Sequence, residues 1–285
     1  MGQFANTAQA EAWNGYEGAQ WARNQERWDA VNDGFNQPLL DAAAVRESDT
    51  VLDIGCGVGR TTRLAARRAA RGRALGLDIS GPMLDRARAS AVREGVENVA
   101  FVQGDAQVHP LDDGAFDAVI SRYGMTFFTD PAAAFANLHR ALRPDGRLAF
   151  ICAAEAEANE WLAALASLND ILPLGGFGKA GSPGMFSLTD PGRIRDLVAA
   201  GGFDRLDVQR IEAAGRWGAD AADAAAFLLD SGPGRHLLDQ VTPPAQAAAR
   251  QALTAVLQRH EADDGVWLRS SSWLVTAVRG GSAHG

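Results

Sequence analysis

Short apolar runs recur along the first half of the chain, and most of them end in an acidic or a polar residue. Between them lie longer stretches, such as 60–73 and 82–92, whose apolar residues have helical spacing. Runs this short indicate strands buried on both faces, and their alternation with helices predicts a doubly wound, mostly parallel sheet. The expected strands lie at 51–54, 74–78, 99–103 and 116–121, then after the turn at 142–148, and at 203–211 and 267–279.

This pattern divides the chain into four parts. Residues 1–45 are predicted to form an N-terminal helical cap, and residues 46–153 are predicted to form the Rossmann-like core. Residues 154–189 form an expected lid insertion, and 190–285 complete the sheet with a second helical insertion at 212–265. We therefore expect a Rossmann-like α/β fold with seven strands, six parallel and one antiparallel. Both insertions leave the sheet on the side where ligands bind in such folds, which favours a lid.

Composition restricts the class of partner. The net charge of −8 disfavours nucleic acid, because phosphate binding requires a basic surface. Cys56 and Cys152 lack C-x-x-C spacing and the histidines are dispersed, which predicts reduced thiols and no metal site. No apolar run reaches the length of a membrane span, and the N-terminus lacks the features of an export signal. We expect a cytoplasmic protein, either a monomer or a homodimer.

The most informative motif is Asp53-x-Gly55-x-Gly57-x-Gly59, which follows the first strand and precedes a helix. Glycines in such a turn let a ligand approach the backbone where a Cβ atom would block it. A dinucleotide site would need a further glycine where the chain has Arg60. An acid in the motif also fits poorly with a pyrophosphate, whose charge it would repel.

Two more acids follow the next strands, Asp78 at the end of 74–78 and Asp105 in Gly104-Asp105-Ala106. With the glycine motif they resemble class I S-adenosylmethionine-dependent methyltransferases. The chain is similar to the ubiquinone/menaquinone-biosynthesis-type small-molecule methyltransferases of actinobacteria. The resemblance covers about residues 45–153.

The resemblance implies a site for S-adenosylmethionine, with S-adenosylhomocysteine as the product. The implied contacts are Asp53, Gly55, Cys56 and Gly57 for the methionine half, Asp78 for the ribose, and Met83, Asp105 and Ala106 for the adenine. The other residues expected at the cofactor are Thr61, Ile79, Gly104, Ser121, Arg122 and Trp21.

The loop after the fourth strand is expected to open into the cavity for the methyl acceptor. The expected wall residues are Tyr123, Met125, Phe127 and Phe128 from this loop, and Trp161 from the lid. A second interpretation is an apolar loop that only covers the end of the sheet. The loop lacks the Asn/Asp-Pro-Pro-aromatic motif of amino-DNA methyltransferases, which argues against DNA as the substrate.

The cap carries three of the seven tryptophans, together with Tyr16. It either packs an aromatic face on the core or closes the cavity. In the second case Tyr16 and Trp21 would line the cavity.

Methyl transfer from a sulfonium requires alignment of the acceptor and exclusion of water, and a base only where the acceptor loses a proton. The candidate bases are Tyr16, Tyr123, His109, Glu17, Glu155 and His236, with the two tyrosines ranked first.

The predicted function is methylation of a small, largely apolar metabolite at carbon, oxygen or nitrogen, in secondary metabolism. One alternative is a protein of the same fold that binds the cofactor but catalyses a reaction without methyl transfer. A less favoured alternative is an NAD(P)-dependent oxidoreductase.

Overall fold

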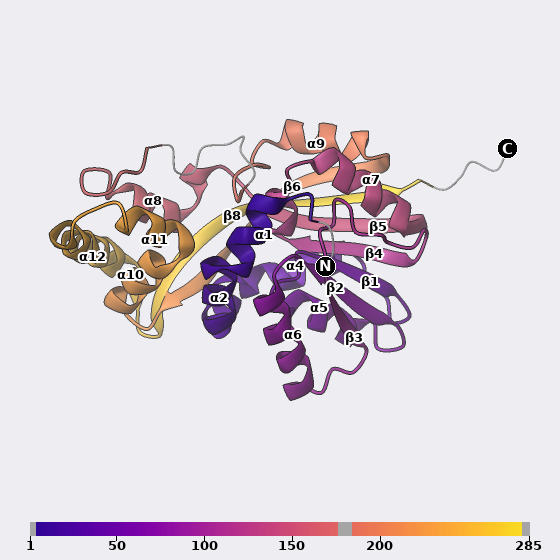
Figure 1. Cartoon of the computed structure of the whole chain (residues 1–285), viewed down its shortest axis with the longest axis horizontal. Coiled ribbons are helices and arrows are strands. Elements are labelled where there is room, and N and C mark those ends of the chain that lie inside the picture. Colours follow the sequence, from indigo (N-terminus) through magenta and orange to yellow (C-terminus); the bar gives the residue numbers. More distant parts are fainter. Residues whose placement is uncertain (1–3, 176–183, 281–285) are drawn as a thin grey trace.

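Within residues 4–175 and 184–280, which the computed structural model describes, eight strands form one sheet (Figure 1). Along the sheet the order is β3-β2-β1-β4-β5-β8-β6, and β7 pairs with β8 outside this path. The bounds are β1 Thr50–Ile54, β2 Arg73–Asp78, β3 Val99–Gln103, β4 Phe116–Arg122, β5 Leu142–Ala153, β6 Phe203–Gly218, β7 Glu261–Ala262 and β8 Gly265–Arg279.

The predicted Rossmann-like α/β class is confirmed. Strands β1 to β5 are parallel, and β8 is antiparallel to both of its long neighbours, β5 and β6. The predicted number of seven strands is wrong, because β7 is an additional strand of two exposed residues that pairs with β8. A strand this short leaves no apolar run by which the sequence could reveal it.

Twelve α-helices surround the sheet in the described part of the chain. They are α1 Thr7–Asn14, α2 Tyr16–Arg23, α3 Gln25–Asn32, α4 Asn36–Ala42, α5 Arg60–Arg68, α6 Gly81–Arg93, α7 Pro131–Ala141, α8 Glu160–Ala166, α9 Pro191–Ala200, α10 Ala221–Asp230, α11 Gly232–Leu238 and α12 Pro243–Leu257. None of them is long and apolar enough to cross a membrane.

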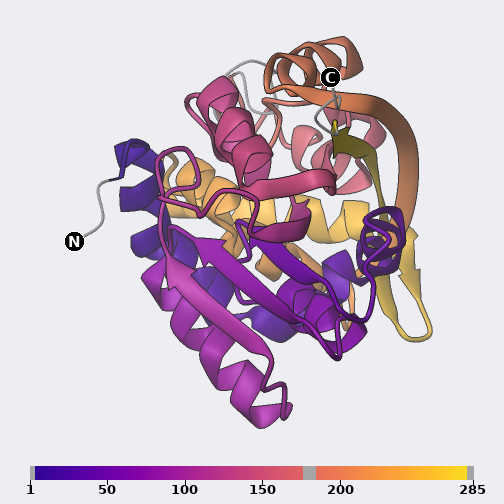
Figure 2. The same ribbon diagram turned by 90° about the vertical axis from the view of Figure 1, so that its right-hand side faces the viewer.

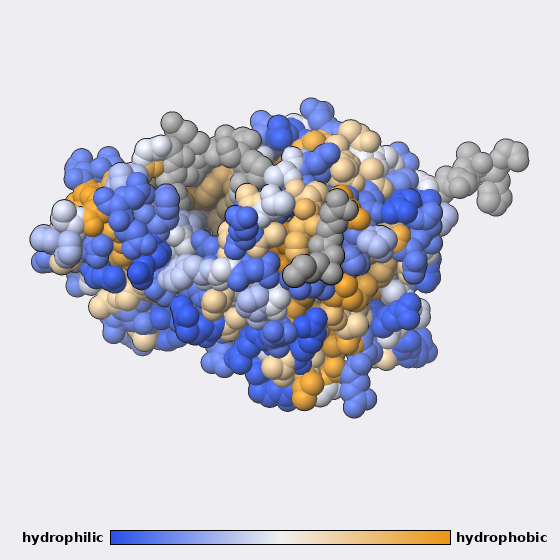
Figure 3. All heavy atoms as spheres, viewed as in Figure 1, coloured by the Kyte–Doolittle hydropathy of each residue, from blue (hydrophilic) through white to orange (hydrophobic). Residues whose placement is uncertain are grey.

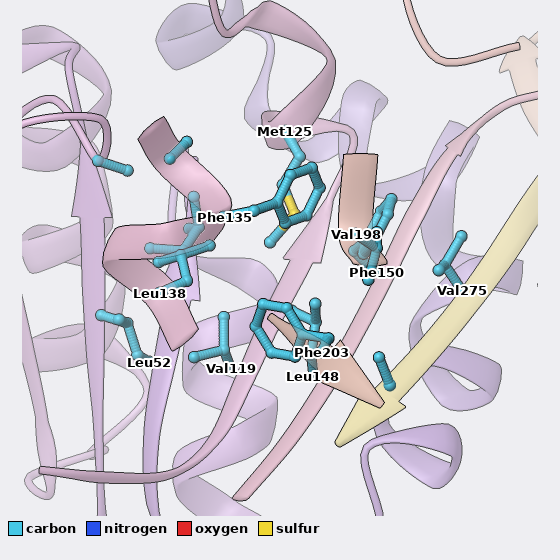
Figure 4. Packing of buried hydrophobic residues seen from close by; sticks show 14 of the residues in the cluster. Leu52, Val119, Met125, Phe135, Leu138, Leu148, Phe150, Val198, Phe203 and Val275 are labelled. Carbon is cyan, nitrogen blue, oxygen red and sulfur yellow. The ribbon is translucent and has the colours of Figure 1, made fainter. Parts of the chain in front are cut away.

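Helices lie on both faces of the sheet (Figure 2). On one face, α4 and α5 pack in a cluster that contains Val51. On the other face, α7 and α9 pack in a cluster that contains Leu52 and Phe135 (Figure 4). Val51 and Leu52 are neighbours in β1, and they serve different clusters because alternate side chains of a strand point to opposite faces. This explains the continuously apolar strands.

β6 and β8 extend beyond the other strands as a two-stranded ribbon. They remain paired from Ala213 opposite Ser270 to Gly218 opposite Val266. The sequence predicted that the sixth strand ends at 211, seven residues earlier than the observed end at Gly218. Helices α8, α10, α11 and α12 gather at this end of the molecule, at the left of Figure 1.

A second hydrophobic cluster holds these helices together. It joins Trp28 of α3, Leu165 of α8 and Trp217 of the ribbon to Leu228 of α10 and Leu253 of α12. The cap and the two insertions, which the sequence divided into separate units, therefore contribute to one core.

Leu253 tests this second cluster. Its side chain is fully buried, so Leu253→Ala removes packing contacts and leaves a cavity. We expect the free energy of unfolding to fall by about 2–5 kcal/mol, measured by equilibrium urea denaturation. The matched control is Gln251→Ala at an exposed position of α12, for which we expect a change below about 0.5 kcal/mol. Equal losses in the two variants would contradict the buried position of Leu253.

Candidate active site

The glycine turn joins the end of β1 to the start of α5. Gly55 and Gly57 have φ angles of 61° and 55°, which residues with a Cβ atom rarely adopt. A Cβ atom on Gly55 would lie 2.6 Å from Cα of Gly124, so the turn packs directly on the loop after β4. The Gly55 N–H donates to the Leu77 carbonyl at 2.8 Å, which ties the turn to β2.

Asp53 lies beneath this turn and is not part of a cavity wall. Its Oδ2 accepts hydrogen bonds from the hydroxyls of Thr61 at 2.6 Å and Thr62 at 2.7 Å, which fixes the first turn of α5. Its Oδ1 is buried and has no hydrogen-bond partner among the described residues. Burial raises the pKa of Asp53 to about 6, although the threonine hydrogen bonds act in the opposite direction.

Asp78 connects the glycine turn to the turn after β2. Its Oδ2 accepts the Gly57 N–H at 2.7 Å and its Oδ1 accepts the Ser80 N–H at 2.8 Å. Burial raises the pKa of this carboxyl group, and the backbone hydrogen bonds oppose the rise. Asp78 lines the same cavity as the glycine turn, beside Ile79 and Met83.

Asp105 fastens the N-terminal cap. Its Oδ2 accepts the N–H groups of Ala5 at 3.0 Å and Asn6 at 2.9 Å, and its Oδ1 accepts the Gln107 N–H at 3.0 Å. The resemblance implied that Asp105 meets an adenine edge, whereas in this structure its carboxylate holds the cap. Asn6 also donates to the carbonyl of Phe127 at 2.7 Å. The start of the chain is thus bound across the ends of β3 and β4.

A second set of hydrogen bonds fixes the cap near Asp78. The Ser80 hydroxyl donates to the Trp13 carbonyl at 2.5 Å. Asn14 accepts the Gly81 N–H at 2.9 Å and donates to the Ile79 carbonyl at 3.0 Å. The end of α1 is therefore attached to the turn that carries Asp78.

Arg122 lines the cavity at the end of β4, whereas its neighbour Ser121 lies beneath it. The Ser121 hydroxyl donates to the Ile54 carbonyl at 2.7 Å. The Arg122 guanidinium donates to the Asn36 side chain and to the Asn32 carbonyl, and it has no carboxylate partner among the described residues. Burial lowers the pKa of Arg122, against the attraction of acids such as Asp29. A guanidinium held this way can pair with a ligand's carboxylate.

Tyr123 lines the cavity with a hydroxyl that is already bonded. That oxygen lies 2.9 Å from the Ser272 hydroxyl. Burial raises the pKa of Tyr123 to about 12, so the phenol is neutral near pH 7 and is a poor general base. Its φ of 65° is unusual for a residue other than glycine, and such strain occurs preferentially at functional sites.

One cavity of about 540 Å³ extends from the glycine turn to the lid helices. A recess with apolar residues is visible between these parts in the space-filling view (Figure 3). Its glycine-turn end includes Gly55, Cys56, Gly57, Thr61, Asp78, Ile79, Met83, Gly104, Asp105, Ala106 and Arg122. The rest of its wall, which we call the aromatic chamber, contains Trp13, Trp21, Trp28, Phe127, Phe128, Trp161, Phe186 and Trp217.

The tryptophans of the chamber contact one another in pairs. The rings of Trp21 and Trp28 are stacked, with centroids 4.2 Å apart and an interplanar angle of 5°. Trp161 stacks on Trp217 at 5.8 Å, and Trp28 meets Trp217 edge to face at 6.1 Å. The cap, the lid and the ribbon thus build one continuous aromatic wall.

Five predicted site residues lie outside the cavity wall: Asp53 and Ser121, which lie beneath it as described above, and Tyr16, His109 and Met125. Tyr16 is 43% exposed and its hydroxyl donates to Asp230 at 3.0 Å. His109 packs behind Gly104, where a Cβ atom would lie 2.4 Å from its Nδ1. Met125 is buried in the sheet core (Figure 4). The expectation that Tyr16 and Met125 line the cavity is therefore wrong.

The cavity residues that were not predicted as site residues include Trp13, Glu17, Trp28 and Trp217. Glu17 was considered only as one of several candidate bases. Trp13, Glu17 and Trp21 follow one another at intervals of four, so the sequence did contain a helical signal for one shared face. Trp217 gave no such signal, because the sequence assigned it to the insertion at 212–265, between an expected strand and an expected helix, and it lies on the ribbon instead.

Residues 52–150, which carry the glycine turn, Asp78 and Asp105, match the family model described as a methyltransferase domain. The chain carries a methyltransferase domain. The prediction of a class I, S-adenosylmethionine-dependent methyltransferase domain is thereby confirmed.

Curated methyltransferases are among the relatives that match part of the chain. Demethylmenaquinone methyltransferase of Thermus thermophilus is 37% identical over 114 residues, which cover 40% of this chain and 51% of that protein. Nocamycin O-methyltransferase of Saccharothrix syringae is 35% identical over 126 residues, which cover 42% of this chain and 45% of that protein. The chain thus spans about half the length of the curated relatives it matches.

Solved structures share the fold of the chain. The YcgJ protein of Bacillus subtilis has a TM-score of 0.56 at 20% identity, with 86% of this chain and 97% of that chain covered. The [4+2]-cyclase SpnF has a TM-score of 0.56 at 19% identity, covering 86% and 80%. Geranyl diphosphate C-methyltransferase of Streptomyces coelicolor, solved with S-adenosyl-L-homocysteine, has a TM-score of 0.51 at 18% identity, covering 87% and 79%.

Asp53 makes the stability of the protein depend on pH. Its folded pKa of about 6 exceeds the ordinary value of 3.8, so the contribution of Asp53 to stability is complete below about pH 4 and is lost as the pH rises through 6. We expect Asp53→Asn to gain about 2 kcal/mol relative to wild type between pH 4.5 and pH 7.5, measured by urea unfolding at both values. Asp112→Asn, an exposed change, is the control. If the difference in unfolding free energy between Asp53→Asn and wild type is the same at both pH values, the raised pKa of Asp53 is refuted.

Proposed function

We propose that the protein transfers a methyl group from S-adenosylmethionine to a small, largely apolar metabolite. The observation that carries this proposal is the single cavity that joins the glycine turn and Asp78 to the aromatic chamber. One end has the backbone and charges that suit a nucleoside and an amino acid. The other end has the apolar walls that suit an organic acceptor.

The residues at the glycine-turn end fit the cofactor. A side chain at Gly57 would meet the Met83 methyl group at 2.8 Å, so glycine keeps this approach open. Asp78 suits the ribose hydroxyls, and Arg122 suits the carboxylate of the methionine half. Asp53 carries a buried oxygen without a partner close to the turn, which agrees with a role beneath the methionine half.

When bound, the sulfonium supplies an electrophilic methyl group and a good leaving group. The chain itself aligns the acceptor and keeps water out, because its tryptophans surround the acceptor on several sides. Tyr123 can orient an acceptor by hydrogen bonding, since its raised pKa keeps the proton on the phenol. The residues of the site thus favour catalysis by alignment.

The resemblance to actinobacterial small-molecule methyltransferases supports a role in secondary metabolism. The fold alone does not separate methyl transfer from a rearrangement, because SpnF, a [4+2]-cyclase, shares it. Product mass does separate them. A gain of one methylene unit by the acceptor supports the proposal, and conversion without a change of mass contradicts it.

Calorimetric titration with S-adenosylhomocysteine, with NADH and NADPH as controls, tests the cofactor site. We expect Asp78→Asn to weaken binding of S-adenosylhomocysteine by about 30-fold, about 2 kcal/mol, because charge-assisted hydrogen bonds to the ribose are lost. Asp85→Asn on the exposed surface of α6 is the matched control and should bind as wild type does. Unchanged affinity in Asp78→Asn would remove Asp78 from the site, and binding of a nicotinamide cofactor alone would overturn the function.

A further inference from the structure

Among the described residues, the cavity wall contains three carboxylates, and only one of them lacks a hydrogen-bond or ion-pair partner there. Asp78 and Asp105 accept backbone N–H groups, as described above. Glu17 of α2 also lines the cavity, but it takes part in no hydrogen bond or ion pair among the described residues. Glu17 is partly buried. A carboxylate that is partly withdrawn from water without a partner costs free energy, so its position favours a ligand that donates to it.

Glu17 lies between the cap and the lid. It stands four residues from Trp13 and four from Trp21, on the stripe of the cap that faces the chamber. Its carboxylate packs on Gly232 at the start of α11, where a Cβ atom would lie 1.5 Å from Oε1. Lid backbone thus covers one side of the group. Burial raises the pKa of Glu17, and no cation among the described residues offsets this effect.

The surroundings of Glu17 also suit a positive charge. Faces of tryptophan rings attract cations, most strongly where water is excluded. Arg122 is the single cationic side chain in the described cavity wall, and its guanidinium donates to Asn36 and Asn32 on the cap. On the lid, Arg235 pairs with Asp239. The chamber therefore combines an unpaired anion with aromatic faces, and no described wall residue satisfies that anion.

We propose that the methyl acceptor is an organic amine that binds as its ammonium ion, with the charge on Glu17 and its apolar body against the chamber's tryptophans. Because an ammonium nitrogen has no lone pair, this group anchors the acceptor, and the methyl group goes to another nucleophilic atom of the molecule. This inference rests on the proposed function and adds the class of acceptor. A neutral apolar acceptor would cover Glu17 without providing a donor, and an anionic acceptor would be repelled by it. An ammonium group satisfies the carboxylate by charge-assisted hydrogen bonds.

Pairs of ammonium compounds and their neutral counterparts test this inference. Tryptamine with indole-3-ethanol and phenethylamine with 2-phenylethanol are titrated calorimetrically at pH 7.5, with S-adenosylhomocysteine present. We expect each amine to bind at least about tenfold more tightly than its alcohol to the wild-type protein. In Glu17→Gln this preference should fall below about twofold, because the amide keeps the shape and loses the charge. Glu11→Gln, an exposed change on α1, should retain the preference.

Three results would overturn the inference: equal affinity of amine and alcohol for wild type, no binding of either amine, or a preference that survives in Glu17→Gln. The affinity for S-adenosylhomocysteine is measured in the same experiment for each variant. If the wild-type protein does not bind S-adenosylhomocysteine, the proposed function is refuted instead. Retained S-adenosylhomocysteine binding without a preference for amines would leave the proposed function standing and remove only the acceptor class.

Discussion

The contact between the Asp78 carboxylate and the N–H groups of Gly57 and Ser80 is the constraint on which the site depends. It joins the turn after β1 to the turn after β2, at the carboxyl ends of adjacent parallel strands, where open α/β sheets bind ligands. The same Ser80 donates its hydroxyl to the cap. A single acidic side chain thus sets the position of the glycine turn and, through the next turn, that of the N-terminal helices.

The cavity exists because three distant segments share a second core. The cap, the segment after β5 and the ribbon of β6 and β8 pack together through Trp28, Leu165 and Trp217. This core leaves the aromatic chamber open between itself and the sheet. The sheet domain therefore forms the glycine-turn end of the cavity, and the added segments form the end that would select an acceptor.

Local patterns determined most of what the sequence could predict. The strands, the glycine turn and the acids near the strand ends depend on residues close together in the chain. The structure places the turn and the acids at the carboxyl ends of adjacent strands. The predictions that were wrong concern which side of a helix a residue faces, or contacts between segments far apart in the sequence. Tyr16 points toward Asp230 while Glu17, one residue on, faces the chamber, because adjacent helical positions differ by about 100°. Met125 turns into the sheet core, and Trp217 lies on a ribbon whose length depends on pairing with β8.

Asp53, beneath the glycine turn, and Glu17, in the cavity wall, share one energetic feature. Burial raises the pKa of both carboxyl groups, so each opposes folding near neutral pH. Substitution of either by an amide would relieve that cost, and selection for stability alone would favour it. At Glu17, which lies in the cavity wall, the proposed ammonium group of the acceptor would offset this cost. Asp53 lies beneath the glycine turn, near the proposed position of the methionine half of the cofactor. Apolar packing in the two hydrophobic cores offsets the free-energy cost of these carboxylates.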